Sequence, residues 1–226
     1  MNDTTTIQPA DWLPADQEIL DHYSGTLRYS FYKLQLTKMI SGLLSMEGNC
    51  RLLDVGTGDG RLGAIIQKYR SKTKVFGLET FIRESRDPNL ELILFDGQHI
   101  PCADRSFEVS LLCDVLHHTD KQTELLSEII RVTRQKIIIK DHLFQSLLER
   151  YQLLLLDFLG NLRFGVKVTA QYLNWNKWQR VFSSQGNLEI DCYPAAPLRK
   201  GLLEEIFPND LEIFFVIHLN QDETRT

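Results

Sequence analysis

Acidic and histidine side chains stand where three apolar, strand-like runs of this chain end. Glu79 ends one run, Asp96 ends the next, and Asp114 ends a third, shortly before His117 and His118. Because ligands of open α/β sheets bind outside the carboxyl ends of the strands, we expect these side chains to line one crevice. Carboxylates can accept hydrogen bonds from ribose hydroxyls or a purine amine, and imidazoles exchange protons near neutral pH. The pattern predicts a site for a nucleoside-like ligand with proton-transfer groups beside it.

A glycine-dense turn precedes these positions and marks an earlier strand end. The run Leu52–Val55, which contains Asp54, is followed by Gly56, Gly58 and Gly60. Glycines let backbone amides approach a ligand without interference from side chains. A dinucleotide-binding fingerprint needs its third glycine one position further on, so no pyrophosphate is required here. The turn fits the amino-acid moiety and ribose of a ligand, although glycine turns also end strands for ordinary steric reasons.

The elements that must position these residues alternate between strand-like and helical patterns. Strands are predicted at Arg51–Val55, Lys74–Leu78, Leu90–Phe95, Phe107–Cys113 and Gln135–Lys140, and helices at Gly60–Tyr69 and Leu116–Val132. Such alternation predicts a parallel sheet with right-handed crossovers. The connection after Glu79 has only about ten residues, whereas a parallel crossover usually needs a dozen or more. We therefore expect a short link there in place of a full helix.

The pattern changes at both ends of the chain. Residues 16–44 have helical spacing and are expected to form two helices, with Thr26 as the N-cap of the second. After residue 140, the predicted elements are a long amphipathic helix at Phe144–Leu159, a helix around Trp175, Trp178 and Phe182, and final strands at Leu188–Tyr193 and Leu211–Leu219.

The order of these motifs resembles the class I S-adenosylmethionine-dependent methyltransferases, and within them the small-molecule type 11 group. The resemblance covers about residues 50 to 141 and is carried by the run Leu53–Gly60, by Glu79, by Asp96-Gly97 and by the run Asp114–His118. It implies a Rossmann-like α/β fold with a seven-stranded, mostly parallel sheet, the last strand antiparallel, and helices on both faces. It also implies S-adenosyl-L-methionine as the cofactor.

The same resemblance assigns cofactor contacts to individual residues. It implies that Gly56 and Gly58 pass the methionine portion, that Glu79 holds the ribose, and that Asp96 and Gly97 read the adenine. An Asp-Gly pair more commonly marks an ordinary turn, so this last assignment depends on its context. The complete set of expected cofactor-binding residues is Asp54, Gly56, Thr57, Gly58, Glu79, Thr80, Asp96, Gly97, Asp114, Val115 and His117.

Catalysis is expected from histidines and a carboxylate that follow strand ends. His118 is the predicted general base for an acceptor that must lose a proton, with Asp141 or His142 as its partner. The same side chains, together with Asp114 and His117, could also ligate a metal ion. Metal-dependent methyltransferases usually carry a glutamate-rich version of this segment, which is absent here. The prediction is therefore a site without a metal ion.

The acceptor is expected to be a small hydrophobic or aromatic molecule. Residues 16–44 and 143–186 lie outside the alternating pattern and carry many aromatic side chains, so we predict that they form a helical cap over the crevice. The bland alternative is that most of these aromatic side chains belong to the core. Two other function classes also remain open: an NAD(P)-dependent oxidoreductase and a non-catalytic methyltransferase-like subunit.

Composition limits the remaining possibilities. A chain of 226 residues with 43% hydrophobic residues suits a single domain with a sizeable core. A net charge of −5 without a long basic run makes a nucleic-acid partner unlikely on electrostatic grounds. The four cysteines have no metal-ligand spacing, and no signal peptide or membrane-spanning run is present, so we predict a cytoplasmic monomer or homodimer with reduced thiols.

Overall fold

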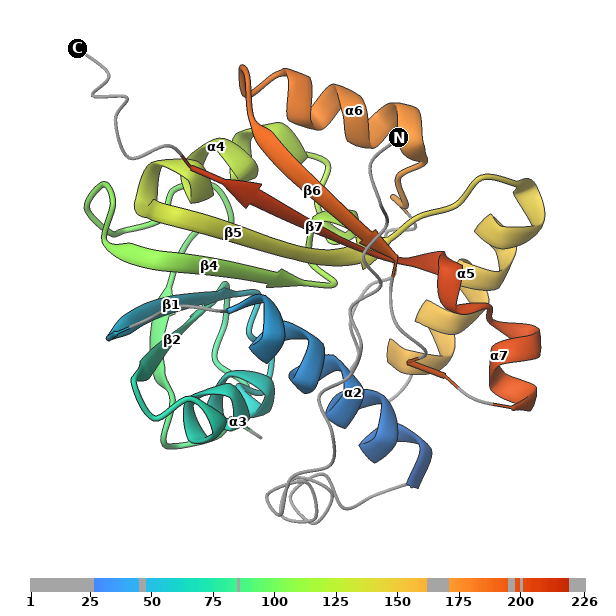
Figure 1. Cartoon of the computed structure of the whole chain (residues 1–226), viewed down its shortest axis with the longest axis horizontal. Coiled ribbons are helices and arrows are strands. Elements are labelled where there is room, and N and C mark those ends of the chain that lie inside the picture. Colours follow the sequence, from blue (N-terminus) through green and yellow to red (C-terminus); the bar gives the residue numbers. More distant parts are fainter. Residues whose placement is uncertain are drawn as a thin grey trace.

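The computed structural model describes residues 27–44, 48–84, 86–161, 171–194, 198–199 and 201–219. A seven-stranded sheet in the order β3-β2-β1-β4-β5-β7-β6 forms its centre (Figure 1). The strands are β1 (Cys50–Val55), β2 (Thr73–Glu79), β3 (Glu91–Leu94), β4 (Phe107–Cys113), β5 (Thr133–His142), β6 (Glu189–Pro194) and β7 (Glu212–His218). Strands β1 to β5 pair in parallel, whereas β7 runs antiparallel to both β5 and β6. The predicted fold class, with its antiparallel last strand, is confirmed.

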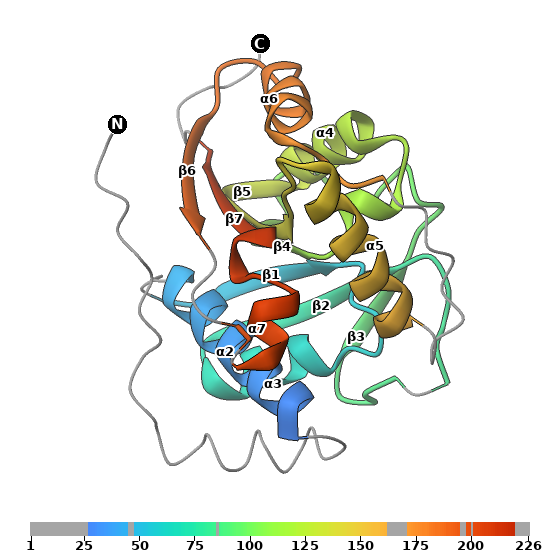
Figure 2. The ribbon, with the colours of Figure 1, turned by 90° about the vertical axis from the view of Figure 1, so that its right-hand side faces the viewer.

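Helices cover both faces of the sheet, as alternation of side chains along each strand requires. On one face, Leu52 of β1 and Ile138 of β5 pack in a buried cluster with residues of α2 (Leu27–Leu43) and α3 (Arg61–Tyr69). On the other face, Leu53 and Ile139 pack with α4 (Gln122–Val132) and α6 (Trp175–Ser183). Figure 2 shows the two helix pairs on opposite sides of the sheet. Neighbouring residues of one strand thus pack in different buried clusters, one on each face of the sheet.

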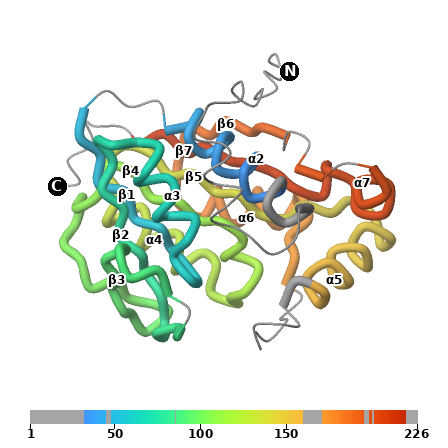
Figure 3. The backbone as a smooth tube through the Cα atoms, turned by 90° about the horizontal axis from the view of Figure 1, so that it is seen from below, coloured from blue at the N-terminus to red at the C-terminus, as the bar shows by residue number. Residues whose placement is uncertain are grey.

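The remaining helices lie near the carboxyl ends of the parallel strands. They are the 3-10 turn η1 (Leu116–His118), α5 (Leu147–Asn161), α7 (Leu202–Ile206) and the 3-10 turn η2 (Asn209–Leu211). Helix α5 lies beyond the strand ends in Figures 1 and 3. Its Leu153 is fully buried in a small apolar cluster with Tyr172, Phe207 and Leu211. This cluster fixes α5 across the edge at which the candidate site residues emerge.

Two predicted helix boundaries differ from the structure, each for a local reason. The expected helix over Leu116–Val132 is divided into η1 and α4, because Thr119 has extended backbone and its hydroxyl accepts a hydrogen bond from the Lys121 amide at 3.0 Å. The helix expected from Phe144 begins at Leu147. There the Glu149 amide donates to Ser146 Oγ at 3.2 Å, and the Glu149 carboxylate accepts from the Ser146 amide at 3.3 Å, which is a capping box.

The link between β2 and β3 contains no helix among its described residues, as its length predicted. It is tied to the glycine turn by the Asp87 amide, which donates to the Asp59 carbonyl at 2.8 Å. The predicted N-cap Thr26 and the first predicted N-terminal helix lie outside the described residues. None of the described helices has the length and apolar character needed to cross a membrane. All four cysteines are free.

The turn after β1 is held by contacts beneath it. Asp54 is 2% exposed, and Thr57 Oγ1 donates to its Oδ2 at 2.7 Å. Gly77 of β2 lies directly below Thr57: a Cβ added to it would lie 2.7 Å from Thr57 Cγ2 and 2.9 Å from Leu90 Cδ2. Burial raises the pKa of Asp54 to about 6, although the hydrogen bond from Thr57 acts in the opposite direction. The position of the turn therefore depends on Gly77, where a side chain would not fit, and on the buried carboxyl group of Asp54.

Gly77→Ala should destabilise the protein by about 1–3 kcal/mol, because the new methyl group must displace Thr57 or Leu90. Gly42→Ala is the matched control, since nothing lies within 4 Å of its added Cβ in α2. That variant should be neutral or up to about 1 kcal/mol more stable, from helix propensity alone. Urea unfolding of both variants measures the difference, and equal effects would show that the turn does not press on β2.

Asp54→Asn should change how stability depends on pH. Since the folded protein holds the Asp54 proton up to about pH 6, against 3.8 for the ordinary carboxyl, the wild-type free energy of unfolding should fall as pH rises between these values. The loss is about 3 kcal/mol at 1.4 kcal/mol per pKa unit. Asparagine keeps an acceptor for Thr57 and carries no charge, so its advantage over wild type should grow from pH 4 to pH 7.

Urea unfolding at pH 4, 5 and 7 tests this difference. Asp120→Asn, at an exposed position, serves as the control and should track the wild type at every pH. Parallel pH profiles for Asp54→Asn and wild type would contradict the assignment of a raised pKa.

Candidate active site

The glycine turn has the backbone conformation that only glycine adopts without strain. Gly56, Gly58 and Gly60 have φ values of +64°, +63° and +77°. An added Cβ on Gly56 would lie 2.8 Å from Val115 Cγ2, so the turn after β1 packs directly on the segment after β4. Nothing lies within 4 Å of an added Cβ on Gly58, so its outer side is open. Two of the predicted strand ends therefore meet here, with open space beside the turn.

Glu79 joins the end of β2 to the same turn. Its Oε2 accepts a hydrogen bond from the Gly58 amide at 3.1 Å, and its Oε1 accepts one from the Thr80 amide at 2.9 Å. The residue is only 7% exposed, and Arg83 Nε lies 4.0 Å from Oε2. The carboxylate is thus fixed in one orientation by two amides and by the Thr80 hydroxyl, which also donates to Oε1 at 3.3 Å. Acceptor capacity for a ligand remains at Oε2.

Asp96 and Gly97 lie at the end of β3, beside β2. The Phe95 amide donates to the Glu79 carbonyl at 3.1 Å, and an added Cβ on Gly97 would lie 3.6 Å from Thr80 Cγ2. Oδ1 of Asp96 accepts from the amides of residues 98 and 99 at 2.8 and 2.7 Å, so the Asp-Gly pair does form a turn. These hydrogen bonds lower the pKa of Asp96 to about 2 and keep it ionised. Its Oδ2 lies 3.3 Å from Nδ1 of His99 and keeps acceptor capacity for a ligand.

Asp114 occupies the end of β4 in a strained conformation. Its φ is +59°, and its amide donates to the Lys140 carbonyl at 2.8 Å. Lys140 Nζ is fully buried and donates to Asp114 Oδ1 at 2.5 Å and to Tyr32 Oη at 2.8 Å. It also pairs with Glu212 of β7, which Arg199 contacts from the other side. Burial acts in the opposite direction, but the charges of Lys140 and His142 hold the pKa of Asp114 well below its usual range.

The histidines that follow β4 and β5 form one cluster. His117 Nδ1 lies 2.6 Å from Asp141 Oδ1, and both side chains are buried. Asp141 also accepts from the amides of Leu116 at 3.0 Å and His142 at 2.7 Å. The ring centroid of His117 lies 4.1 Å from that of His118 and 4.8 Å from that of His142. The carboxylate predicted to assist His118 therefore contacts His117 instead, while all four residues do gather at one place.

The protonation preferences of these rings differ. Burial acts against the shift, but the charge and hydrogen bond of Asp141 raise the pKa of His117. Burial and the nearby His117 lower the pKa of His118, and burial lowers that of His142. The Nδ1 atom of His118 is buried and has no hydrogen-bond partner among the described residues. His118 is therefore favoured as a neutral imidazole. The lone pair of its unprotonated ring nitrogen can bind a proton or a metal ion.

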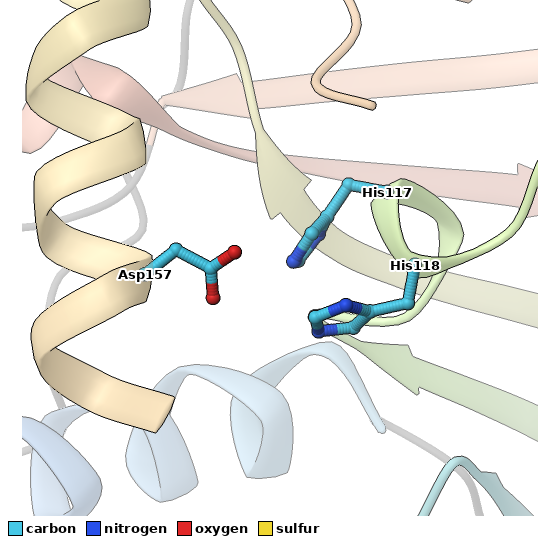
Figure 4. Close-up of side chains that lie close together, drawn as sticks. All are labelled: His117, His118 and Asp157. Carbon is cyan, nitrogen blue, oxygen red and sulfur yellow. The ribbon is translucent and has the colours of Figure 1, made fainter. Parts of the chain in front are cut away.

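Asp157 enters the cluster from α5 and has no counterpart in the sequence-based prediction. Its side chain points toward His117 and His118, as Figure 4 shows. Tyr172 Oη donates to its Oδ2 at 2.9 Å, and the residue is 9% exposed. The only sequence signal for this role is that Asp157 is an acidic residue on the same helix face as the buried Leu153. Lys140, which interrupts the apolar run of β5, is the corresponding signal for the buried ion network.

The helix α6 belongs mainly to the core. Trp178 is fully buried, and its ring centroid lies 4.9 Å from that of Phe215 on β7. Its indole Nε1 donates to the His142 carbonyl at 3.2 Å, which ties α6 to the end of β5. Trp175 is 43% exposed. The core interpretation thus holds for Trp178, and Trp175 remains available to a ligand.

A family model described as a methyltransferase domain matches residues 53–139. A chain from the complex between the Haloferax volcanii Trm112 methyltransferase activator and its methyltransferase is similar in structure, with 12% identity, a TM-score of 0.63, and coverage of 90% of this chain and 92% of that one. No curated protein matches the sequence.

Two bacterial structures match to a similar degree. An S-adenosylmethionine-dependent methyltransferase from Aquifex aeolicus has 12% identity and a TM-score of 0.59, over 91% of this chain and 98% of that one. A methyltransferase from an antibiotic biosynthesis pathway of Anabaena variabilis has 12% identity and a TM-score of 0.59, over 83% of this chain and 97% of that one. At these identities the structural matches show the fold, and the family match adds the domain type. Residues 53–139 thus match the methyltransferase domain model, and the chain has the fold of S-adenosylmethionine-dependent methyltransferases.

Proposed function

We propose that this protein transfers a methyl group from S-adenosyl-L-methionine to a small hydrophobic or aromatic molecule. The observation that carries the proposal is the fixed Glu79 carboxylate, which accepts from the Gly58 amide at 3.1 Å across the open glycine turn. A ribose needs an oriented acceptor pair of this kind, and the turn leaves room beside it for the rest of the ligand. The family match favours this reaction over the oxidoreductase alternative.

The donors and acceptors at the other strand ends fit the same cofactor. Asp114 is ionised, and its side chain is 31% exposed while Lys140 behind it is fully buried, so it can also pair with the ammonium group of a methionine moiety. Oδ2 of Asp96 and the amide of Gly97 suit an adenine edge. Asp54, Thr57, Thr80 and Val115 support the loop from below and beside it, and His117 borders it at the end of β4.

Bound there, the cofactor supplies an activated methyl group, so the protein must mainly place the acceptor in line with it. For an acceptor that has to lose a proton, we assign proton removal to His118, whose neutral form burial favours. Asp141 then acts as a positioning residue through His117, and His142 completes the cluster.

The acceptor pocket is assigned to the region between the histidines and the helices outside the alternating pattern. Helix α5 lies across the strand ends and directs Asp157 toward the cluster. Trp175, Tyr151 and Phe158 are exposed aromatic side chains in the predicted cap segment 143–186. Aromatic side chains in a cap segment suit a flat or apolar acceptor.

Glu79→Gln should lower the affinity for S-adenosyl-L-methionine about 10- to 100-fold, because hydrogen bonds from the ribose to a charged acceptor become bonds to a neutral one. Glutamine still accepts from Gly58, so the turn should keep its shape. Glu91→Gln is the matched control, since that exposed acid of β3 contacts Lys74 and should bind the cofactor as wild type does. Isothermal titration calorimetry gives the dissociation constants. An unchanged value for Glu79→Gln would refute the ribose assignment.

Incubation with isotope-labelled cofactor and a metabolite extract tests the reaction itself. The expected result is one or a few small apolar products that carry the labelled methyl group, detected by mass spectrometry. Cofactor binding without any labelled product would instead favour the non-catalytic subunit.

A further inference from the structure

Three side chains with metal-ligating atoms converge at the carboxyl end of β4. His117 and His118 come from the 3-10 turn η1, and Asp157 comes from α5 on the opposite side (Figure 4). One ligand atom from each residue lies within 4.8 Å of the others. Ligand atoms around one tetrahedral Zn²⁺ are about 3.5 Å apart, given bond lengths of about 2.0–2.2 Å. Small side-chain rotations therefore suffice to bring the three atoms around one ion.

The surroundings of these ligands are those that a metal site requires. A ligating histidine usually donates its other ring nitrogen to a carboxylate, which fixes the tautomer and the ring orientation. His117 has this arrangement, because its Nδ1 lies 2.6 Å from the buried Asp141. Asp157 is likewise fixed by the hydroxyl of Tyr172 at 2.9 Å. Two of the three ligands are thus oriented by neighbours that would not themselves touch the ion.

His118 supplies the third ligand and the least constrained one. Its Nδ1 atom is buried without a hydrogen-bond partner among the described residues, which is costly unless something binds there. A cation bound by that nitrogen would satisfy it. Neutral imidazole is also the form that ligates metals.

We propose that His117, His118 and Asp157 bind a divalent transition-metal ion. Two imidazoles and one carboxylate favour an ion such as Zn²⁺ over Mg²⁺ or Ca²⁺, which prefer oxygen ligands. Three protein ligands leave a coordination position open, as in catalytic zinc sites. This inference departs from the metal-free site that the sequence predicts.

The site deepens the proposed function and rests on it for the identity of the reaction. A hydroxyl or phenol oxygen of the acceptor would take the open position, and the ion would lower the pKa of that group so that its proton leaves to solvent. The oxygen would keep a lone pair with which to attack the methyl group. His118 then serves as a ligand in the metal-bound protein, and the ion takes over the part assigned to a general base. An acceptor with a hydroxyl or phenol group next to an apolar body fits such a site.

Zinc binding to the full chain tests the site without any activity assay. The protein is stripped with a chelator and titrated with Zn²⁺ by calorimetry, and Co²⁺ substitution gives visible absorption bands that report a low-coordinate nitrogen and oxygen site. We expect one ion per chain, no comparable binding of Mg²⁺, and an affinity about 100-fold or more lower in His118→Ala and Asp157→Ala. Asp141→Asn, beside a ligand, should lose about 10- to 100-fold.

His218→Ala is the matched control, because this histidine of β7 contacts Asp191 away from the cluster. It should bind Zn²⁺ as wild type does. Asp157→Asn serves if the alanine variant does not fold, since asparagine still accepts from Tyr172 but ligates weakly. No stoichiometric binding by wild type, or equal affinity in His118→Ala, Asp157→Asn and His218→Ala, would overturn the proposal.

Cofactor titrations on the metal-stripped protein separate this inference from the proposed function. Binding of S-adenosyl-L-methionine without Zn²⁺ binding would remove the metal site and leave methyl transfer with His118 as base. Zn²⁺ binding without cofactor binding would support the metal site and contradict the proposed methyl transfer.

Discussion

The buried charge of Lys140 is the constraint on which the arrangement of the site depends. A lysine that is fully inaccessible to solvent must be paired, because an unpaired ammonium in the interior costs several kcal/mol. Its partners come from three elements: Asp114 at the end of β4, Glu212 at the start of β7, and Tyr32 on α2. The ion pair holds Asp114 in a backbone conformation that a residue with a side chain rarely adopts. The direction in which the chain leaves β4 follows from this pairing.

The segment after Asp114 transmits that constraint to the histidines. Val115 packs on Gly56 of the glycine turn, and the Leu116 amide donates to Asp141 at the end of β5. The short turn that carries His117 and His118 is thus fixed from two neighbouring strands. Helix α5 adds Asp157 from the opposite side, held by the apolar cluster around Leu153. The groups that we assign to the cofactor and those that we assign to the acceptor are therefore held by the same set of contacts.

Much of the fold follows from the sequence, because short apolar runs separated by turns leave few alternatives. The strands and the glycine turn were predictable for that reason, as was the short link after β2. Helix limits were less so: the hydroxyls of Thr119 and Ser146 decide where α4 and α5 are interrupted or begin. Hydrogen bonds made by these hydroxyls do not change the spacing of the apolar residues, so the hydrophobic pattern alone cannot predict them.

The grouping of side chains in the candidate site was predictable for residues at strand ends, and not for residues that come from helices or distant strands. Asp141 was assigned to the right cluster, but which histidine it contacts depends on the tight path of η1. Asp157 and Glu212 reach the site only through tertiary packing, and a pattern confined to neighbouring positions cannot place them. Lys140 directly follows a run of isoleucines in the sequence, and this position indicates a buried lysine that needs a carboxylate partner.

The antiparallel strand β7 has a consequence for the order of folding. It inserts between β5 and β6 and brings Glu212 to Lys140, although the two residues are far apart in the chain. During synthesis on the ribosome, the central strands emerge long before that carboxylate does. Until Glu212 arrives, the Lys140 ammonium group lacks one of its carboxylate partners and remains hydrated. The edge of the incomplete sheet must therefore stay accessible to water. Burial of Lys140 at the edge of the candidate site is thus coupled to the arrival of the last strand.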